Sequence, residues 1–163
     1  MRRGKTRLGE AQTGFTYLWL LAGLAVLSIG MAAAGPLWAQ QTQRDREAEL
    51  LRVGRAYAVA IEHYYRSQPG GIHELPRSVD DLLQDGRFTT PTRHLRAAYS
   101  DPMQPGKPLT LLFSAAGGIR GVASDSADRP IRQSAPPDSR LTLPTNMLAE
   151  HYRDWQFLAS LSS

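Results

Sequence analysis

The feature that most constrains this chain is a long stretch without charge near its N-terminus. No charged residue occurs between Glu10 and Arg44, and the segment from Tyr17 to Ala39 is almost wholly apolar or small. At about 1.5 Å per residue, about 20 apolar residues cross a bilayer core as a helix. The sequence therefore predicts a transmembrane helix here, with Pro36 near its outer end.

A short basic segment precedes this run and indicates its orientation. Four of the 19 basic side chains, but only one of the 15 acidic ones, lie before Gly14. Positive charge is retained on the cytoplasmic side of a membrane, so we expect a cytoplasmic N-terminus. The rest of the chain is nearly neutral, and no basic stripe with interleaved aromatic residues follows, which argues against nucleic-acid binding.

The N-terminus could be a plain membrane anchor or a secretory signal peptide. A signal peptidase cut after Ala39 would place Leu37 where a small residue is required, and the apolar run is longer than a usual signal core. We therefore favour a retained helix. The chain has no cysteine, which excludes disulfides, thiol catalysis and cysteine-based zinc sites.

The helix is expected to continue beyond the apolar run. Apolar residues then recur every three or four positions, with charges between them, at Leu50, Val53, Tyr57, Ile61 and Tyr64. This spacing predicts an amphipathic helix with one buried face. Because Ser67 to Gly71 is a helix-breaking stretch, we predict one helix from Phe15 to Tyr65, apolar all round in its first half.

A small sheet and short helices are expected after this helix. Ser78 with Asp81 three residues later predicts a capped helix, and Thr90 with Pro91 predicts the start of another turn or short helix. Two apolar runs, 109–114 and 119–124, flank the sequence AAGG and predict a β-hairpin.

The remaining C-terminal segments are predicted from weaker patterns. A third strand is expected from Pro130, followed by a linker over 135–144. A last helix is expected from Thr145, because four apolar residues recur at helical spacing, at Leu148, Tyr152, Trp155 and Leu158. The fold class predicted is α+β.

The sequence contains no motif that points to an enzyme. The four histidines have no metal-binding spacing, and nucleotide-binding and nucleophile motifs are absent. One acidic loop contains Ser124, Asp125 and Asp128, whose oxygen atoms are the kind that Ca²⁺ prefers. Arg129 adjoins this loop and only two carboxylates are present, so a solvated turn is favoured over a calcium site.

The stretch G-F-T-Y-L, Gly14 to Leu18, opens the apolar helix directly after the basic leader. It resembles the prepilin peptidase site of the type IV pilin and type II secretion pseudopilin superfamily. The resemblance implies cleavage after Gly14 and methylation of the new N-terminal Phe15. Pro36 then falls at mature position 22, where many pilins have a proline. The segments 99–103 and 117–131 are loosely similar to stretches of the major pseudopilin, and they underlie the calcium hypothesis.

The resemblance implies a filament subunit with a pilin-like fold. Such a subunit is made in the bacterial inner membrane as a single-pass protein with a periplasmic head. It is cut by a prepilin peptidase and assembled with other pseudopilins and inner-membrane components of the secretion system. Small residues such as Gly23 would let neighbouring helices approach closely.

One residue departs from the family pattern. The family usually has glutamate at mature position five, which neutralises the charged N-terminus of a neighbouring subunit, whereas this chain has Trp19 there. Some minor pseudopilins also lack this glutamate. The departure favours a minor or atypical pseudopilin over an ordinary major subunit.

The expected organisation has four segments. Residues 1–14 form the leader, 15–43 the transmembrane and assembly helix, 44–135 the pilin-like head, and 136–163 the linker and C-terminal helix. The main alternative is a membrane-anchored periplasmic binding or scaffold domain that does not polymerise, and a secreted domain is the next.

Overall fold

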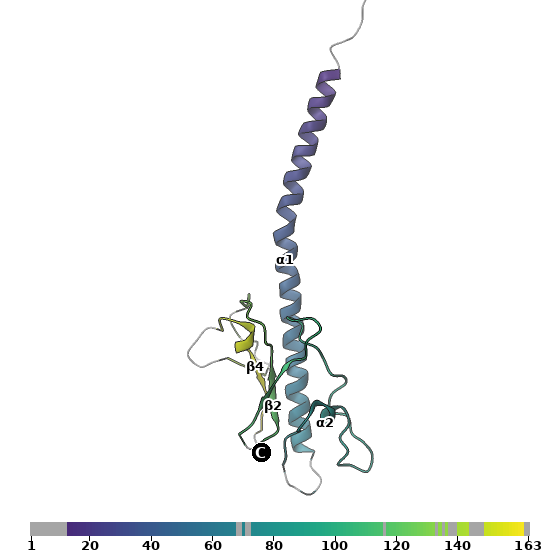
Figure 1. The fold of residues 1–163 in the computed structure, drawn as a ribbon, viewed down its shortest axis with the longest axis vertical. Helices are drawn as coiled ribbons and strands as arrows, with labels where there is room; N and C mark the ends of the chain where they lie inside the picture. Colours follow the sequence, from purple (N-terminus) through teal and green to yellow (C-terminus); the bar gives the residue numbers. More distant parts are fainter. Residues whose placement is uncertain are drawn as a thin grey trace, which may run out of the picture. The chain divides into compact units, whose positions relative to one another are not determined.

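A computed structural model describes most of the chain beyond the leader. The described residues are 13–67, 70, 73–115, 117–132, 134, 136, 140–143 and 149–161, and the side chains of 13, 14 and 29–37 are outside the description. The chain divides into two compact units, Met1–Thr42 and Gln43–Ser163. Helix α1, Thr13–Arg66, belongs to both (Figure 1). We call its residues up to Thr42 the apolar half and those from Gln43 the packing half.

The predicted long helix is confirmed by α1, but the prediction that it crosses a membrane is contradicted. Over the residues that the structure describes, no helix combines the length and the apolar character needed to cross a bilayer. The expectation of a single-pass inner-membrane protein with a cytoplasmic N-terminus and a periplasmic head is therefore wrong.

The second unit contains an antiparallel sheet. Its four strands are β1 (Thr110–Phe113), β2 (Ile119–Ala123), β3 (Leu141–Thr142) and β4 (Gln156–Leu158). They are ordered β1-β2-β4-β3, so the last strand in the chain lies between β2 and β3. The long helix and this sheet make the fold α+β, as expected.

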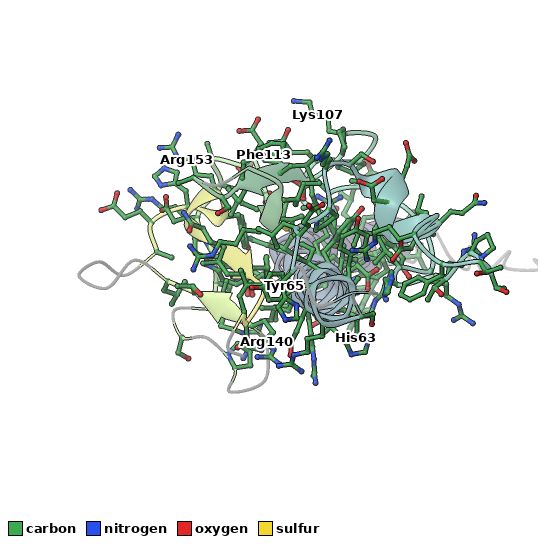
Figure 2. All side chains as sticks on the ribbon, turned by 90° about the horizontal axis from the view of Figure 1, so that it is seen from below. His63, Tyr65, Lys107, Phe113, Arg140 and Arg153 are labelled. Atoms are coloured by element: carbon green, nitrogen blue, oxygen red, sulfur yellow. The ribbon has the colours of Figure 1, made fainter. Side chains whose placement is uncertain are left out.

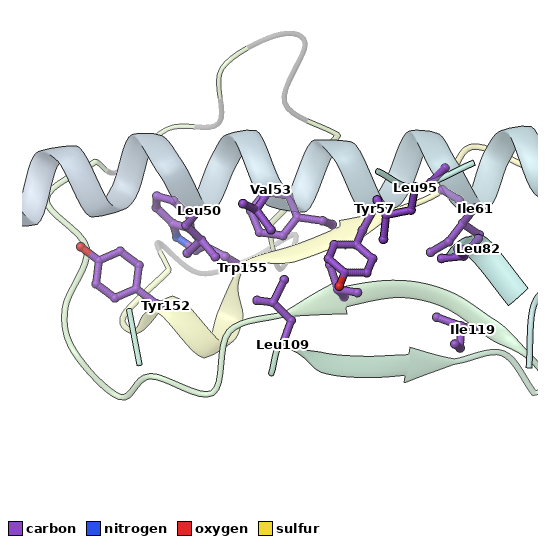
Figure 3. Packing of buried hydrophobic residues seen from close by; sticks show 14 of the residues in the cluster. Leu50, Val53, Tyr57, Ile61, Leu82, Leu95, Leu109, Ile119, Tyr152 and Trp155 are labelled. Carbon is purple, nitrogen blue, oxygen red and sulfur yellow. The ribbon is translucent and has the colours of Figure 1, made fainter. Parts of the chain in front are cut away.

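The packing half of α1 lies against this sheet. The predicted apolar face is confirmed, because all five of its residues are buried: Leu50, Val53, Tyr57, Ile61 and Tyr64. Figure 3 shows Leu50 and Val53 close to Trp155, while Ile61 lies near Leu82. Seen along the helix, His63 lies on the side opposite to Phe113, and both side chains are exposed (Figure 2).

A glycine in α1 permits the close approach of the sheet. A Cβ atom at Gly54 would overlap the ring of Phe157, which is fully buried in β4. Any larger residue at position 54 would therefore push the helix from the strand. This contact links two residues more than 100 positions apart in the sequence.

The predicted capped helix is confirmed by α2, Val79–Leu83. The Asp81 amide donates to Ser78 Oγ at 3.3 Å, and the Ser78 amide donates to Asp81 Oδ2 at 3.0 Å. From Thr90 a turn or a short helix was expected, and the described residues 88–98 form no helix. Instead, Thr92 forms an isolated antiparallel bridge with Asp85, because the two backbones hydrogen-bond to each other.

The predicted hairpin is also confirmed. Strands β1 and β2 pair from Thr110 with Ala123 to Phe113 with Ile119, with an irregularity after Leu112. Gly117 and Gly118 adopt φ angles of 87° and 82° in the connection. These left-handed conformations favour glycine, which explains the GG pair at this turn.

The C-terminal segment folds differently from the prediction. Residues 149–161 contain no α-helix; they form the single 3-10 turn Tyr152–Asp154 followed by β4. The segment expected to be a linker supplies the short strand β3. The third strand predicted from Pro130 is also wrong for the described residues 130–132, which pair with no strand.

Candidate functional site

The most unusual surface of the molecule is the apolar half of α1. Large hydrophobic side chains in this half are 44–77% exposed: Phe15, Tyr17, Leu18, Trp19, Leu20, Leu21, Leu24, Val26, Leu27 and Trp38. Consecutive helical residues are separated by about 100°, so five consecutive exposed residues, 17–21, reach every side of the helix. A soluble helix that is apolar all round is normally buried. This surface therefore requires neighbours on several sides.

The residues of the predicted processing site lie at the start of this helix. Because α1 begins at Thr13, Gly14 and Phe15 are in its first turn. The rings of Phe15 and Trp19 meet edge to face, with centroids 6.3 Å apart, and both are about two-thirds exposed. The first turn therefore presents an open aromatic pair.

The other two residues predicted for helix assembly lie further along α1. No atom lies within 4 Å of a Cβ built at Gly23, so this position is open to an approaching neighbour. Pro36 is within the bounds of α1, but its side chain lies outside the described residues. The predicted role of Gly23 in close helix packing stays a prediction.

The three residues predicted to bind calcium lie in one loop, and the side chains of two of them, Ser124 and Asp128, hydrogen-bond to other side chains. Ser124 Oγ donates to Asp101 Oδ2 at 2.6 Å, and Asp128 Oδ2 accepts from Ser126 Oγ at 3.1 Å. Asp125 is exposed. Among the described residues, no three His, Cys, Asp or Glu side chains are grouped to hold a metal ion. The calcium hypothesis gains no support and remains untested.

The buried Asp101 is the centre of this loop, and the sequence did not connect it with Ser124. Its Oδ1 accepts from the Met103 amide at 2.9 Å, so both carboxylate oxygens have donors. Asp101 and Ser124 are each only 1–2% exposed. Hydrogen bonds from the chain itself therefore satisfy this buried carboxylate.

A second buried carboxylate fastens the same loop to α1. Glu47 Oε1 accepts from the amides of Ile131 and Arg132 at 2.6 and 3.0 Å, and from the Tyr152 hydroxyl at 2.9 Å. One turn earlier, Gln43 Nε2 donates to the Tyr152 hydroxyl at 3.0 Å. Burial raises the pKa of Tyr152 to about 12, so this hydroxyl remains a donor to Glu47 at neutral pH.

A third group of polar side chains, which we call the Asp85 cluster, consists of Tyr64, Asp85, Arg87 and His94. Arg87 pairs with both oxygens of the buried Asp85, and its guanidinium lies 3.5 Å from the centre of the Tyr64 ring. His94 Nε2 lies 3.1 Å from Asp85 Oδ2. The Arg87 hydrogen bonds hold the pKa of Asp85 well below its usual range.

The Asp85 cluster attaches the loop after α2 to the helix α1. Arg87 also donates to the Tyr64 carbonyl at 3.2 Å, which ties the loop after α2 to the end of α1. The rings of Tyr64 and His94 meet edge to face, with centroids 5.5 Å apart. The sequence offered only one signal of this cluster, the D-G-R turn at 85–87, and no spacing rule predicts its partners.

A cavity of about 630 Å³ lies beside the C-terminal end of α1. The rings of Tyr65 and His73 stack at its wall with centroids 4.9 Å apart, and His73 Nδ1 donates to the Tyr65 carbonyl at 2.9 Å. Its remaining lining residues are Glu74, Leu75, Arg77, Ser114, Gly117, Gly118 and Leu161. None of the lining residues is buried, so the cavity holds no desolvated charge that would select a ligand.

Comparisons of the chain with protein-family models, curated proteins and solved structures found no match. The candidate site is therefore defined by the chain's own residues. It is the exposed apolar half of α1, which begins at the G-F-T-Y-L stretch.

Proposed function

We propose that the chain is a pseudopilin-type subunit of a type II secretion or related type IV pilus-like system. In this proposal a prepilin peptidase removes the leader after Gly14, and the helix that begins at Phe15 joins neighbouring helices in a filament. The resemblance of G-F-T-Y-L to the prepilin site supports the cut. The observation that supports the assembly is that the described large apolar side chains of this half-helix are exposed, on every side of the helix at 17–21.

The proposed mechanism is physical rather than catalytic. Burying one large apolar side chain contributes about 1.5–3 kcal/mol, and ten such side chains are exposed among the described residues of this half-helix. A single groove would cover only one side, whereas a bundle of like helices covers all of them. Small residues such as Gly23 and Ala25 allow the backbones of neighbouring helices to approach closely.

Processing and assembly can be tested in one experiment. Because the chain has no cysteine, Ala25→Cys introduces a unique reporter in the apolar half. Co-expression with a prepilin peptidase should yield chains that begin at methylated Phe15, measured by N-terminal sequencing. Oxidation of those chains should yield disulfide-linked dimers, because neighbouring helices bring the reporters together.

The matched control carries Gly14→Ala together with Ala25→Cys. It keeps the apolar helix but should retain the leader, whose four basic side chains oppose close packing of helix N-termini. We expect at least a ten-fold loss of disulfide-linked dimers. Normal processing of the control, or equal dimer yields from the two proteins, would contradict the proposed function.

A further inference from the structure

The two edges of the sheet are held differently, and this contrast does not depend on the proposed function. Strand β1 pairs with β2 through four residue pairs within one hairpin. Strand β3, at the other edge, pairs with β4 through only two, at Leu141 and Thr142. Just before β3, the Arg140 carbonyl accepts from the Leu158 amide at 3.3 Å. So short a strand has little backbone attachment of its own.

An ion pair to α1 supplements this attachment. Arg140 Nη2 lies 3.1 Å from Oε2 of Glu62, a residue of α1 that is only 5% exposed. Arg66 pairs with the other carboxylate oxygen, with Nη2 2.8 Å from Oε1. Because Glu62 Oε2 has no hydrogen-bond partner among the described residues, its contact with Arg140 is an ion pair without hydrogen-bond geometry. The side chain of Arg140 therefore joins the start of β3 to the helix.

The backbone at Arg140 is strained. Its φ angle is 57°, and it is the one non-glycine residue with a positive φ in the part of the chain that the structure describes. A residue with a side chain crowds the backbone in this left-handed region, so it keeps the conformation only where its surroundings hold it. The ion pair with Glu62 is one such restraint. Without it, we expect residue 140 to leave this conformation and β3 to lose its alignment with β4.

We infer that β3 is a detachable edge strand and that the Glu62–Arg140 ion pair is the latch that keeps it on β4. Proteins open locally where few contacts hold a segment, while the rest of the fold stays intact. Release of β3 would leave backbone groups of β4 unpaired on that side. An unpaired strand edge is a template for pairing with another chain, so the latch controls whether this side of the sheet is open to one.

The test measures hydrogen exchange of two amides of the full chain by NMR. Leu158 donates to Arg140 on the β3 side, and its neighbour Ala159 donates to the Arg120 carbonyl at 3.0 Å on the β2 side. Detachment of β3 exposes the first amide and not the second. In the parent chain we therefore expect Leu158 to exchange at least about ten-fold faster than Ala159, after correction for their intrinsic rates.

Glu62→Gln keeps the shape of the side chain but removes the ion pair. It should speed the exchange of Leu158 by a further factor of about three to ten and leave Ala159 within about two-fold of the parent. The matched control is Arg66→Gln, which removes the other partner of Glu62 and keeps the latch, so both amides should stay within about two-fold of the parent. Screening by about 1 M salt should speed the exchange of Leu158 in the parent but not in Glu62→Gln.

Three results would overturn the inference. One is exchange of Leu158 as slow as that of Ala159 in the parent, which would show that β3 opens only with the rest of the sheet. Another is no acceleration in Glu62→Gln, or equal acceleration of both amides, which would mean that the ion pair is not a latch for β3. The third is an acceleration of Leu158 in Arg66→Gln as large as in Glu62→Gln. None of these results bears on processing after Gly14, so the proposed function is tested separately.

Discussion

The two halves of α1 contain similar residues in opposite environments. In the packing half, Leu50 and Val53 are 0% and 1% exposed, whereas in the apolar half Leu24 and Val26 are 52% and 70% exposed. The packing half is covered by segments of its own chain, the sheet among them. The difference teaches that hydrophobicity alone does not decide burial within the chain, because burial needs a complementary surface. The second unit provides one for the packing half, whereas the described large apolar side chains of the first unit are exposed.

The largest difference between the two halves is expected in the free energy of unfolding when a tryptophan is replaced with alanine. Trp155 is fully buried against the packing half, so Trp155→Ala should lower the free energy of unfolding of the second unit by about 3–5 kcal/mol. Trp19→Ala should leave this free energy unchanged within about 0.5 kcal/mol, because Trp19 is exposed. Denaturant unfolding monitored by circular dichroism measures both, and equal losses would remove the distinction between the halves.

Replacing a glycine of α1 with alanine should change stability by less. It also compares two positions of the same helix, Gly54 and Gly23. Gly54→Ala places a methyl group in the ring of Phe157, and overpacking of this kind typically costs about 1–3 kcal/mol. The better helix propensity of alanine offsets up to about 1 kcal/mol of this cost. Gly23→Ala meets no atom within 4 Å and should not destabilise the fold. Thermal unfolding of the two variants tests this, and a stable Gly54→Ala protein would show that the strand contact is adaptable.

The smallest expected effect concerns how the free energy of unfolding of the second unit depends on pH. It is absent at neutral pH and appears in acid. The folded-state pKa of Asp85 is lowered by Arg87, so Asp85 binds fewer protons in the folded than in the unfolded state. Its contribution is complete above the unfolded value of about 3.9 and is lost as pH falls toward the lower folded pKa. The free energy of unfolding should therefore fall less steeply between pH 5 and 2 in Asp85→Asn than in the parent.

The apolar half provides the comparison for this pH dependence. It has no acidic side chain, so self-association of the processed chain should not change through titration of that half over the same range. Sedimentation of the processed chain at each pH measures this. Identical unfolding slopes for the parent and Asp85→Asn would contradict the role assigned to the Asp85 cluster.

Local patterns in the sequence predicted the elements that depend on nearby residues. The capping pair Ser78 and Asp81, the glycine pair of the hairpin and the apolar spacing of α1 each act within a few positions. Those elements formed as expected because their stabilising contacts are local. The candidate site was visible for the same reason, since charge-free length and the G-F-T-Y-L stretch are properties of contiguous sequence.

The C-terminal segment shows why a local pattern can mislead. Tyr152, Trp155 and Leu158 recur every three residues and suggested a helix, yet Trp155, Phe157 and Ala159 also alternate, as strand residues do. The structure buries the alternating set and places β4 between β2 and β3. In the structure β4 pairs with the edge of β2, and Phe157 packs against Gly54. Both contacts favour the strand, and both involve other parts of the chain that the sequence of this segment does not indicate.

The sequence by itself determined the long helix, its apolar and amphipathic halves, the capped turn and the hairpin, because each follows from periodicity or turn chemistry over short distances. Only the tertiary structure decided the sheet order, the Asp85 cluster and the attachment of the acidic loop through Glu47. Those features join residues far apart in the chain. Their energies depend on which surfaces meet, so no single segment contains the information that specifies them.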